Sequence, residues 1–174
     1  MERRNRLKGL LRAALASAVI AVCALVYIPV LTVPITLSLL AVYASLFLLG
    51  WRSTLISVSL YIAMGALGLP VFSGFSGGVG HLLGQSGGYI FGLFALVLVY
   101  ALLDRILQGR LARIFASALS LAALYTVGGA WYFFVYLGAE GIFSVLIMTL
   151  VFLPFDLVKI LLANLIGKRI GKSV

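Results

Sequence analysis

The chain has 174 residues, of which 64% are hydrophobic and only 10% are charged, and its formal net charge is +9. A globular domain of this size cannot bury that much apolar surface, so the composition excludes a water-soluble protein and predicts one embedded in a lipid bilayer. In such a protein, a positive charge is better explained by membrane topology than by nucleic-acid binding.

Apolar segments recur along the chain, and each is expected to form a helix because backbone groups in lipid must find hydrogen-bond partners within the protein. These segments are residues 11–27, 35–50, 54–67, 88–103, 111–132 and 154–172. No internal repeat or soluble linker separates them. We therefore expect residues 1–174 to form one domain, an all-α integral membrane bundle of six transmembrane helices.

The basic residues predict how this bundle sits in the membrane. Of the 13 Lys and Arg residues, all but Lys159 lie on one side of the six-helix arrangement. Since cytoplasmic ends and loops carry the excess of Lys and Arg, both termini are expected in the cytoplasm. The first apolar segment is too long for a signal peptide and no convincing cleavage site follows it, so we expect it to be retained.

The apolar run of residues 141–167 would be ~40 Å long as one helix, which exceeds a hydrocarbon core of ~30 Å. Pro154 offers a point where a new helix can begin, because the first position of a helix does not need the missing N–H. We therefore expect a short helix over residues 141–152 near the outer mouth and a separate crossing helix from Pro154 onwards. Asp156 would then be stabilised by the positive end of the helix dipole.

Two ionisable residues, Asp156 and Lys159, stand inside this apolar run. An ionised side chain in a membrane segment costs at least ~2.5–3.5 kcal/mol to insert and normally marks a substrate or ion path. Three residues apart on a helix, the two side chains share a face and can meet the same ligand. The alternative is a structural ion pair, although desolvation makes such pairs weak sources of stability.

A glycine-rich segment, residues 68–88, gives a second signal. It holds eight of the 19 glycines and no Lys, Arg, Asp or Glu. Glycine lets the backbone approach a ligand closely, and irregular backbone at membrane depth is tolerated only against protein or a wet cavity. The predicted topology puts this segment on the same outer side as Asp156 and Lys159, so both signals predict one extracytoplasmic cavity.

An enzyme is the main alternative of another class. Gly84–Gly88 fits the pattern G-x-S-x-G and resembles the nucleophile motif of rhomboid intramembrane proteases, with Ser86 as the nucleophile. A hydrolase elbow needs a strand before the serine, and His81, the one histidine, lies in the same loop rather than on another helix. His81 also lacks the partners of a metal site, and Ile166 stands where a P-loop needs glycine. We therefore expect no catalytic residue, metal or nucleotide site.

Small and aromatic residues suggest two contact surfaces. Ala14 and Ala18 form a small-xxx-small pair on the first helix, which favours close helix packing either within the chain or with a partner protein. Aromatic residues crowd the outer end of the fifth helix, as is typical of a membrane interface, and one or two of them are expected to stack on a ligand.

The glycine-rich segment and the sixth helix together resemble the BioY family, the biotin-specific substrate-binding (S) components of energy-coupling factor (ECF) transporters. The matching strings are Gly68-Leu69-Pro70-Val71-Phe72, the glycine run from Gly74 to Gly80, Gly87-Gly88-Tyr89, and Pro154-Phe155 followed by Asp156-x-x-Lys159. The likeness extends over nearly the whole chain in length, spans and loop order. The chain departs from the family at Gln85-Ser86, where Pro-Thr is common, and in having no basic or amide side chain near Phe75-Ser76.

This resemblance implies an S-component fold in a bacterial inner membrane that captures biotin outside the cell, or another vitamin or small metabolite. The binding residues it implies are Asp156, Lys159, Phe75, Ser76, Gly77, Gly78, Tyr89 and Trp131. It also implies a transmembrane coupling protein and two ATPase subunits as partners. Only the ATPases would use ATP, and the face of Ala14 and Ala18 would be the docking surface.

Overall fold

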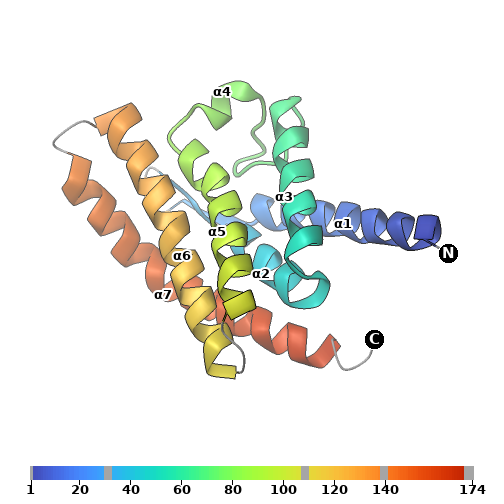
Figure 1. Ribbon diagram of the computed structural model, residues 1–174. Helices are drawn as coiled ribbons and strands as arrows, with labels where there is room; N and C mark the ends of the chain where they lie inside the picture. The colour runs from blue at the N-terminus through green and yellow to red at the C-terminus, as the bar shows by residue number, and fades with distance from the viewer. Residues whose placement is uncertain (1, 30–32, 107–109, 138–140, 171–174) are drawn as a thin grey trace.

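The structure is a computed structural model that describes residues 2–29, 33–106, 110–137 and 141–170. These residues form a bundle of helices with one small hairpin (Figure 1). The helices are α1 (Glu2–Leu25), α2 (Ser38–Leu49), α3 (Trp51–Ala66), α4 (Val79–Leu82), α5 (Gly87–Ile106), α6 (Arg110–Tyr132), its π-helical continuation η1 (Phe133–Leu137), and α7 (Gly141–Ile170). Each predicted apolar segment therefore overlaps a helix, although residues 27 and 35–36 belong to the hairpin and residues 171–172 lie outside the described residues.

Four of the helices in the described part of the chain are long and apolar enough to cross a membrane. They cover Leu7–Leu25, Gly87–Ile106, Ala112–Val135 and Val145–Ile170. Two shorter helices that were predicted to cross, α2 and α3, have 12 and 16 residues. At 1.5 Å per residue they reach about 18 and 24 Å, less than a hydrocarbon core of ~30 Å. An all-α membrane fold is thus supported, whereas a count of six full crossings is not confirmed.

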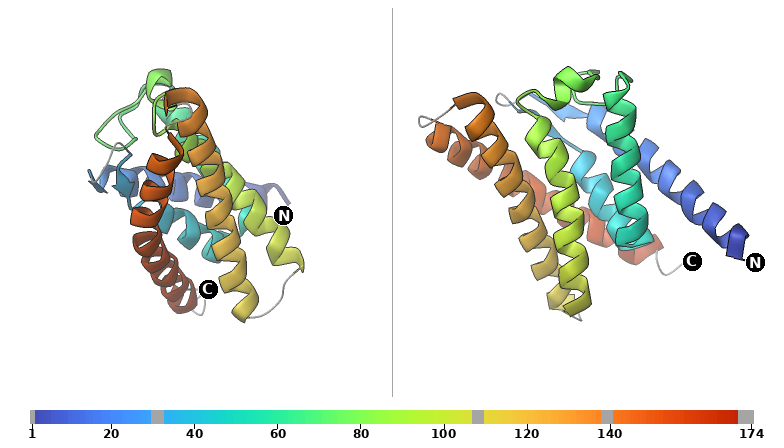
Figure 2. Two further views of the ribbon diagram at one scale, coloured as in Figure 1. Left: turned by 90° about the vertical axis from the view of Figure 1, so that its left-hand side faces the viewer. Right: turned by 45° about the horizontal axis from the view of Figure 1, so that its top comes forward.

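The predicted helix break at Pro154 is wrong. α7 is a single helix of 30 residues with Pro154 in its interior, so there is no separate helix over residues 141–152. Asp156 consequently lies far from a helix N-terminus, and the dipole of a first turn does not act on it. A proline inside a helix loses one backbone hydrogen bond, which packing against neighbouring helices offsets in membrane proteins. A helix of this length is accommodated in a bilayer by tilting, and α7 runs obliquely to α6 (Figures 1 and 2).

The link between α1 and α2 is a β-hairpin, which the sequence prediction missed. β1 (Tyr27–Ile28) pairs antiparallel with β2 (Ile35–Thr36), so that Tyr27 faces Thr36 and Ile28 faces Ile35. The segment is rich in β-branched residues, which favour strands. After α2, Gly50 turns the chain into α3 with a φ of 79°, a backbone conformation that favours glycine.

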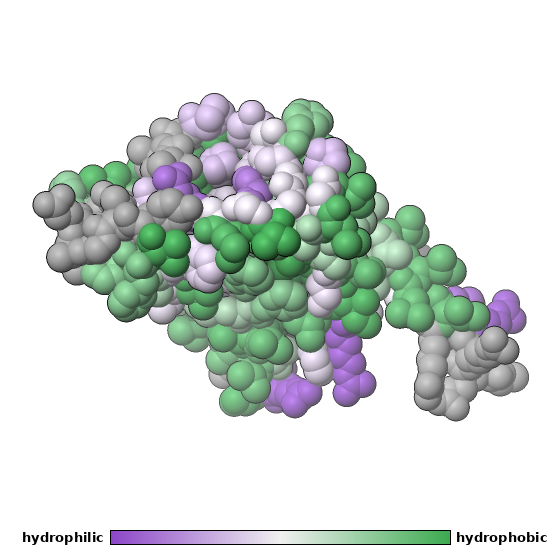
Figure 3. All heavy atoms as spheres, turned by 90° about the horizontal axis from the view of Figure 1, so that it is seen from above, coloured by the Kyte–Doolittle hydropathy of each residue, from purple (hydrophilic) through white to green (hydrophobic). Residues whose placement is uncertain are grey.

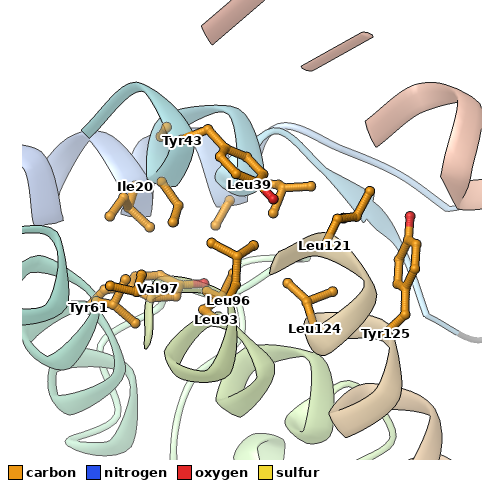
Figure 4. Packing of buried hydrophobic residues seen from close by; sticks show 14 of the residues in the cluster. Ile20, Leu39, Tyr43, Tyr61, Leu93, Leu96, Val97, Leu121, Leu124 and Tyr125 are labelled. Carbon is orange, nitrogen blue, oxygen red and sulfur yellow. The ribbon is translucent and has the colours of Figure 1, made fainter. Parts of the chain in front are cut away.

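The core joins α1, α2, α3, α5 and α6 through buried aliphatic and tyrosine side chains (Figure 4). Tyr43 on α2 is completely buried, and its hydroxyl donates to the carbonyl of Ser117 on α6 at 2.8 Å. The outside of the helices carries many exposed leucine, valine and phenylalanine side chains, as expected of surfaces that face lipid. Seen from above, the face that includes α4 has a centre of hydrophilic and intermediate residues, drawn purple and white, flanked by hydrophobic residues, drawn green (Figure 3).

Candidate functional site

A cavity lies between the hairpin, the glycine-rich segment and helices α2, α3, α5, α6 and α7. The space that the centre of a water-sized sphere can reach in it is about 90 Å³, whereas all empty space, including the part continuous with the exterior, is about 670 Å³. Most of its wall is apolar or aromatic and comes from Val33, Pro34, Ile35, Leu39, Tyr61, Phe72, Ile90, Leu93, Leu124 and Phe152. A wall of this kind with a few polar groups is typical of small-ligand sites.

Asp156 and Lys159 face this cavity from α7. Each residue is only 6% exposed, and Lys159 Nζ donates to Asp156 Oδ1 at 2.6 Å. The pair therefore carries no net charge, which lowers the cost of keeping both groups buried. An ammonium has three N–H donors, and Asp156 is its one hydrogen-bond partner among the described residues. Two donors are therefore left for a ligand.

Tyr125 on α6 also contacts this pair. Its hydroxyl donates to Asp156 Oδ2 at 2.7 Å, so both carboxylate oxygens accept a bond from the protein. Each oxygen still has a second lone pair to offer. Figure 4 shows the Tyr125 ring projecting from α6 with its hydroxyl directed away from the labelled core residues. The carboxylate is held in one orientation by two helices.

Tyr89 on α5 contributes a buried polar atom to the same wall. Its hydroxyl is shielded from solvent and has no hydrogen-bond partner among the described residues. The ring packs edge-on against Phe152, with centroids 6.1 Å apart, and lies over Gly128, where a side chain would collide with it. A buried hydroxyl without a partner is costly in the free protein and is satisfied when a ligand bonds to it.

Of the eight predicted binding residues, Asp156, Lys159 and Tyr89 line the cavity together. The four from the glycine-rich segment do not line it. Phe75 is 68% exposed and has a φ of 56°, and the Gly78 amide already donates to the carbonyl of Gly65 at 2.6 Å. Gly77 lies so close to the Leu69 carbonyl that a side chain would not fit. These residues shape the segment behind the cavity.

Ser76 connects this segment to α5 through His81. The Ser76 hydroxyl donates to the carbonyl of Ser73 at 2.7 Å and lies 3.0 Å from His81 Nδ1. On the other side of the ring, His81 Nε2 lies 3.0 Å from Ser86 Oγ. Ser73 and Ser86 line the cavity, whereas His81 and Ser76 stand behind them.

Trp131 lies outside the cavity wall. Its indole N–H donates to the carbonyl of Gly84 at 3.1 Å, and its ring lies 5.8 Å from that of Phe91. The side chain also covers Gly88, where any Cβ would meet it. Trp131 thus fastens α6 to the start of α5.

Several cavity residues were not anticipated. The hairpin contributes Thr36, whose hydroxyl lies 2.7 Å from that of Ser38 at the start of α2. The β-branched run around Pro34 was the available signal for this strand. Nothing in the local sequence marked Tyr125, because its role depends on α6 lying against α7. Among the described residues, no group of three His, Cys, Asp or Glu side chains is placed to hold a metal ion.

Ala14 and Ala18 lie on the outer face of α1. Both are exposed, whereas Ala13, Ser17 and Ile20 on the opposite face are buried. The pair is therefore not used for packing within the described part of the chain. The face is free to meet lipid or another protein.

A family profile and individual relatives all match this chain to one family. The sequence profile of the BioY family matches residues 1–174. The biotin transporter BioY of Thermotoga maritima is 32% identical over 166 residues, which are 95% of this chain and 97% of that protein. The probable biotin transporter BioY of Pyrococcus horikoshii is 37% identical over 118 residues, 68% of this chain and 70% of that one.

Solved structures show the same fold. A crystal structure of the S-component for biotin from an ECF-type ABC transporter matches with a TM-score of 0.85 and 28% identity, and covers 99% of this chain and 95% of that one. The S component of another bacterial ECF transporter matches with a TM-score of 0.60 at 13% identity, covering 97% and 95%, and so shares the fold. With a family profile and relatives that extend over nearly its full length, the chain belongs to the BioY family.

Proposed function

We propose that this chain captures biotin from the extracytoplasmic side of a bacterial inner membrane and serves as the substrate-binding component of an ECF-type transporter. The observation that carries the proposal is the Asp156–Lys159 pair, buried at the wall of a largely apolar cavity with hydrogen-bonding capacity left over. The names of the relatives, biotin transporters and an S-component for biotin, support the same ligand.

The chemistry of biotin fits these groups. Biotin has a ureido ring with two N–H donors and a carbonyl, an apolar thiophane ring, and a valerate chain that ends in a carboxylate. Asp156 accepts a ureido N–H, and Lys159 donates either to the ureido carbonyl or to the ligand carboxylate. The Tyr89 hydroxyl gains the partner that it lacks in the free protein. The apolar wall encloses the thiophane ring, as the walls of small-ligand pockets commonly do.

The proposed orientation places both termini in the cytoplasm and the cavity at the outer side. The placement of 12 of the 13 Lys and Arg residues supports it. So does the ribbon, in which the N-terminal end of α1 and the C-terminal end of α7 both lie on the right of Figure 1, away from α4 at the top. A ligand would then enter beside the glycine-rich segment.

Uptake in this proposal needs partners. A transmembrane coupling protein would dock on the exposed face of Ala14 and Ala18, and two ATPase subunits would supply the energy from ATP. Small residues let helices approach closely in membranes, where dispersion and close packing drive association. The whole bundle would then topple to deliver biotin inward. The chain itself needs no cofactor for this role.

An S component for another vitamin or small metabolite is the remaining alternative, and the names of the relatives do not favour it. Serine catalysis is not favoured either, although Ser86 and His81 are within hydrogen-bond distance. The family consists of transporter components and not of enzymes.

Isothermal titration of the purified chain with biotin in detergent tests the proposal. We expect saturable binding of one biotin per chain, and thermal stabilisation by biotin but not by thiamine or riboflavin at equal concentration. Stabilisation by a different vitamin with no response to biotin would assign the cavity to that vitamin. No response to any of them would remove the substrate-binding role.

A further inference from the structure

His81 is the one histidine of the chain, and its ring joins two walls of the cavity from behind. Nδ1 lies 3.0 Å from Ser76 Oγ, and Nε2 lies 3.0 Å from Ser86 Oγ. The ring is stacked on Phe72, with centroids 5.1 Å apart and planes at 18°. Both ring nitrogens are therefore in use, and the plane of the ring is fixed.

The direction of these hydrogen bonds follows from the number of protons. Ser76 has one hydroxyl proton, which it donates to the carbonyl of Ser73 at 2.7 Å. It must therefore accept a proton from His81, so Nδ1 carries the N–H. A neutral imidazole then has a bare Nε2, which accepts the hydroxyl proton of Ser86. The relay runs from Ser86 through His81 and Ser76 to the Ser73 carbonyl.

The surroundings of the ring favour this neutral form. Burial lowers the pKa of His81 below its usual value of 6.5, and no neighbouring charge contributes to the shift. The described groups that face the ring are the Phe72 side chain, which is itself edge-on to the titratable Tyr61, and the two serine hydroxyls. The charged groups on the same cavity, Asp156 and Lys159, are paired with each other.

We propose that His81 is a positioning residue that determines which hydrogen-bonding role Ser86 offers to the ligand. With its proton donated to His81, Ser86 presents only lone pairs to the cavity and selects a ligand N–H. This inference rests on the proposed function, because it assumes that the ligand is bound at this wall. It adds a second acceptor for a ligand N–H to the one that Asp156 provides in the same cavity.

Protonation of His81 would reverse the relay. Nε2 would then donate to Ser86, and the serine proton would have to turn towards the cavity and away from the imidazole. Ser86 would then direct a proton, beside its one remaining lone pair, at the position that a ligand N–H occupies. Since the complex would therefore bind this proton less readily than the free protein, affinity falls as the pH drops through the pKa of His81, by up to tenfold per pH unit.

Nitrogen NMR of the histidine-labelled protein in detergent tests the relay without any ligand, and a single histidine needs no assignment. We expect the Nδ1–H tautomer at pH 7.5 and a midpoint below 6.5. Ser86→Ala should shift the Nε2 signal, whereas Ser59→Ala, which removes a serine bonded to the carbonyl of Leu55 on α3, should not. An Nε2–H tautomer at pH 7.5 would overturn the proposal.

Biotin titration from pH 8 down to one pH unit below the midpoint found by NMR tests the consequence for binding. Wild-type affinity should be constant at pH 7 and above and decline as the pH falls through that midpoint, which lies below 6.5. His81→Gln keeps an acceptor for Ser86 that does not titrate, so its affinity should stay within about threefold of wild type at pH 7.5 and be flat with pH. His81→Phe keeps the stacked ring without the acceptor and should bind about tenfold more weakly at pH 7.5.

A common pH profile for wild type and His81→Gln would refute the role of His81. Equal affinity of wild type and His81→Phe would refute it as well. If no variant binds biotin while the NMR spectrum shows the expected tautomer, the failure lies in the proposed ligand. The hydrogen bonds from Ser86 through His81 to Ser76 would then be confirmed in the free protein, and biotin would be ruled out as the ligand.

Discussion

Tyr125 on α6 donates a hydrogen bond of 2.7 Å to Asp156 on α7, and so joins the two helices at the cavity wall. The carboxylate accepts Tyr125 on one oxygen and Lys159 on the other. Its orientation is therefore set before a ligand arrives. Preorganisation of this kind strengthens binding because less freedom is lost when the complex forms.

Replacing Tyr125 by Phe removes this bond and leaves the ring. We expect biotin to bind about tenfold more weakly, equivalent to ~1.4 kcal/mol, because Asp156 is then free to rotate. Tyr43→Phe is the matched control, since it removes a buried hydroxyl that is bonded to Ser117 and Ser120 and does not line the cavity. The control should lower the melting temperature and keep the affinity. Equal biotin affinities for the two variants would show that the Tyr125 hydroxyl does not contribute to binding.

The Asp156–Lys159 pair predicts a contrast between single and double variants. Asp156→Asn and Lys159→Met should each weaken biotin binding by at least about a hundredfold, since each loses a charge-assisted hydrogen bond of ~1.5–3 kcal/mol and leaves a buried group without its partner. The double variant should also fail to bind, but its melting temperature should recover because no buried charge is left.

Titration calorimetry and thermal melting measure these two effects separately. Asp104→Asn is the control, because Asp104 is exposed in the last turn of α5 and does not line the cavity. Unchanged affinity in Lys159→Met would show that the pair is purely structural.

Tyr89→Phe should have opposite effects on the free and bound protein. The variant removes a buried hydroxyl that has no partner among the described residues, so the free protein should melt at the same temperature or higher. The stabilisation by saturating biotin should shrink, because the complex loses one hydrogen bond worth ~0.5–1.5 kcal/mol. Melting curves with and without biotin give both values. A lower melting temperature of the free variant would mean that the hydroxyl is already bonded.

Two glycines of one loop should respond differently to alanine. A Cβ on Gly77 would lie 2.9 Å from the carbonyl carbon of Leu69, whereas a Cβ on Gly80 would meet nothing within 4 Å. Gly77→Ala should therefore destabilise the protein by about 1–3 kcal/mol through overpacking, and weaken binding as the segment shifts. Gly80→Ala lies in α4 and should be neutral or slightly stabilising. Thermal melting of both variants checks this, and equal losses would contradict it.

The docking proposal predicts loss of uptake without loss of binding. Ala14→Trp combined with Ala18→Trp places bulk on the exposed face of α1, where close helix approach is needed. Biotin titration should be unchanged, while uptake with the coupling protein and ATPases is abolished. Leu98→Trp, on an exposed position of α5, is the control and should keep both activities. Co-purification of the double variant with its partners would refute this surface.

The site was predictable where a residue's chemistry is unusual for its surroundings. Asp156 and Lys159 stand out in any apolar run because a charge in lipid is costly, so their importance did not depend on the fold. Tyr89 was predicted as a binding residue from the family resemblance. Phe75 and Trp131 look equally suitable for a ligand in the sequence, yet one points to the exterior and the other packs on Gly88. Which aromatic ring faces a cavity depends on contacts between distant segments.

The amino-acid sequence by itself determined that the protein is embedded in lipid, that it is helical, and that Asp156 and Lys159 are important. Composition and the cost of burying a charge act locally along the chain, so they can be read without the fold. Only the tertiary structure decided that Pro154 stays inside α7, that a hairpin lines the cavity, and that Tyr125 and Ser86 reach it. These depend on packing between helices that are far apart in sequence, where neighbouring helices offset the hydrogen bond that a proline forfeits.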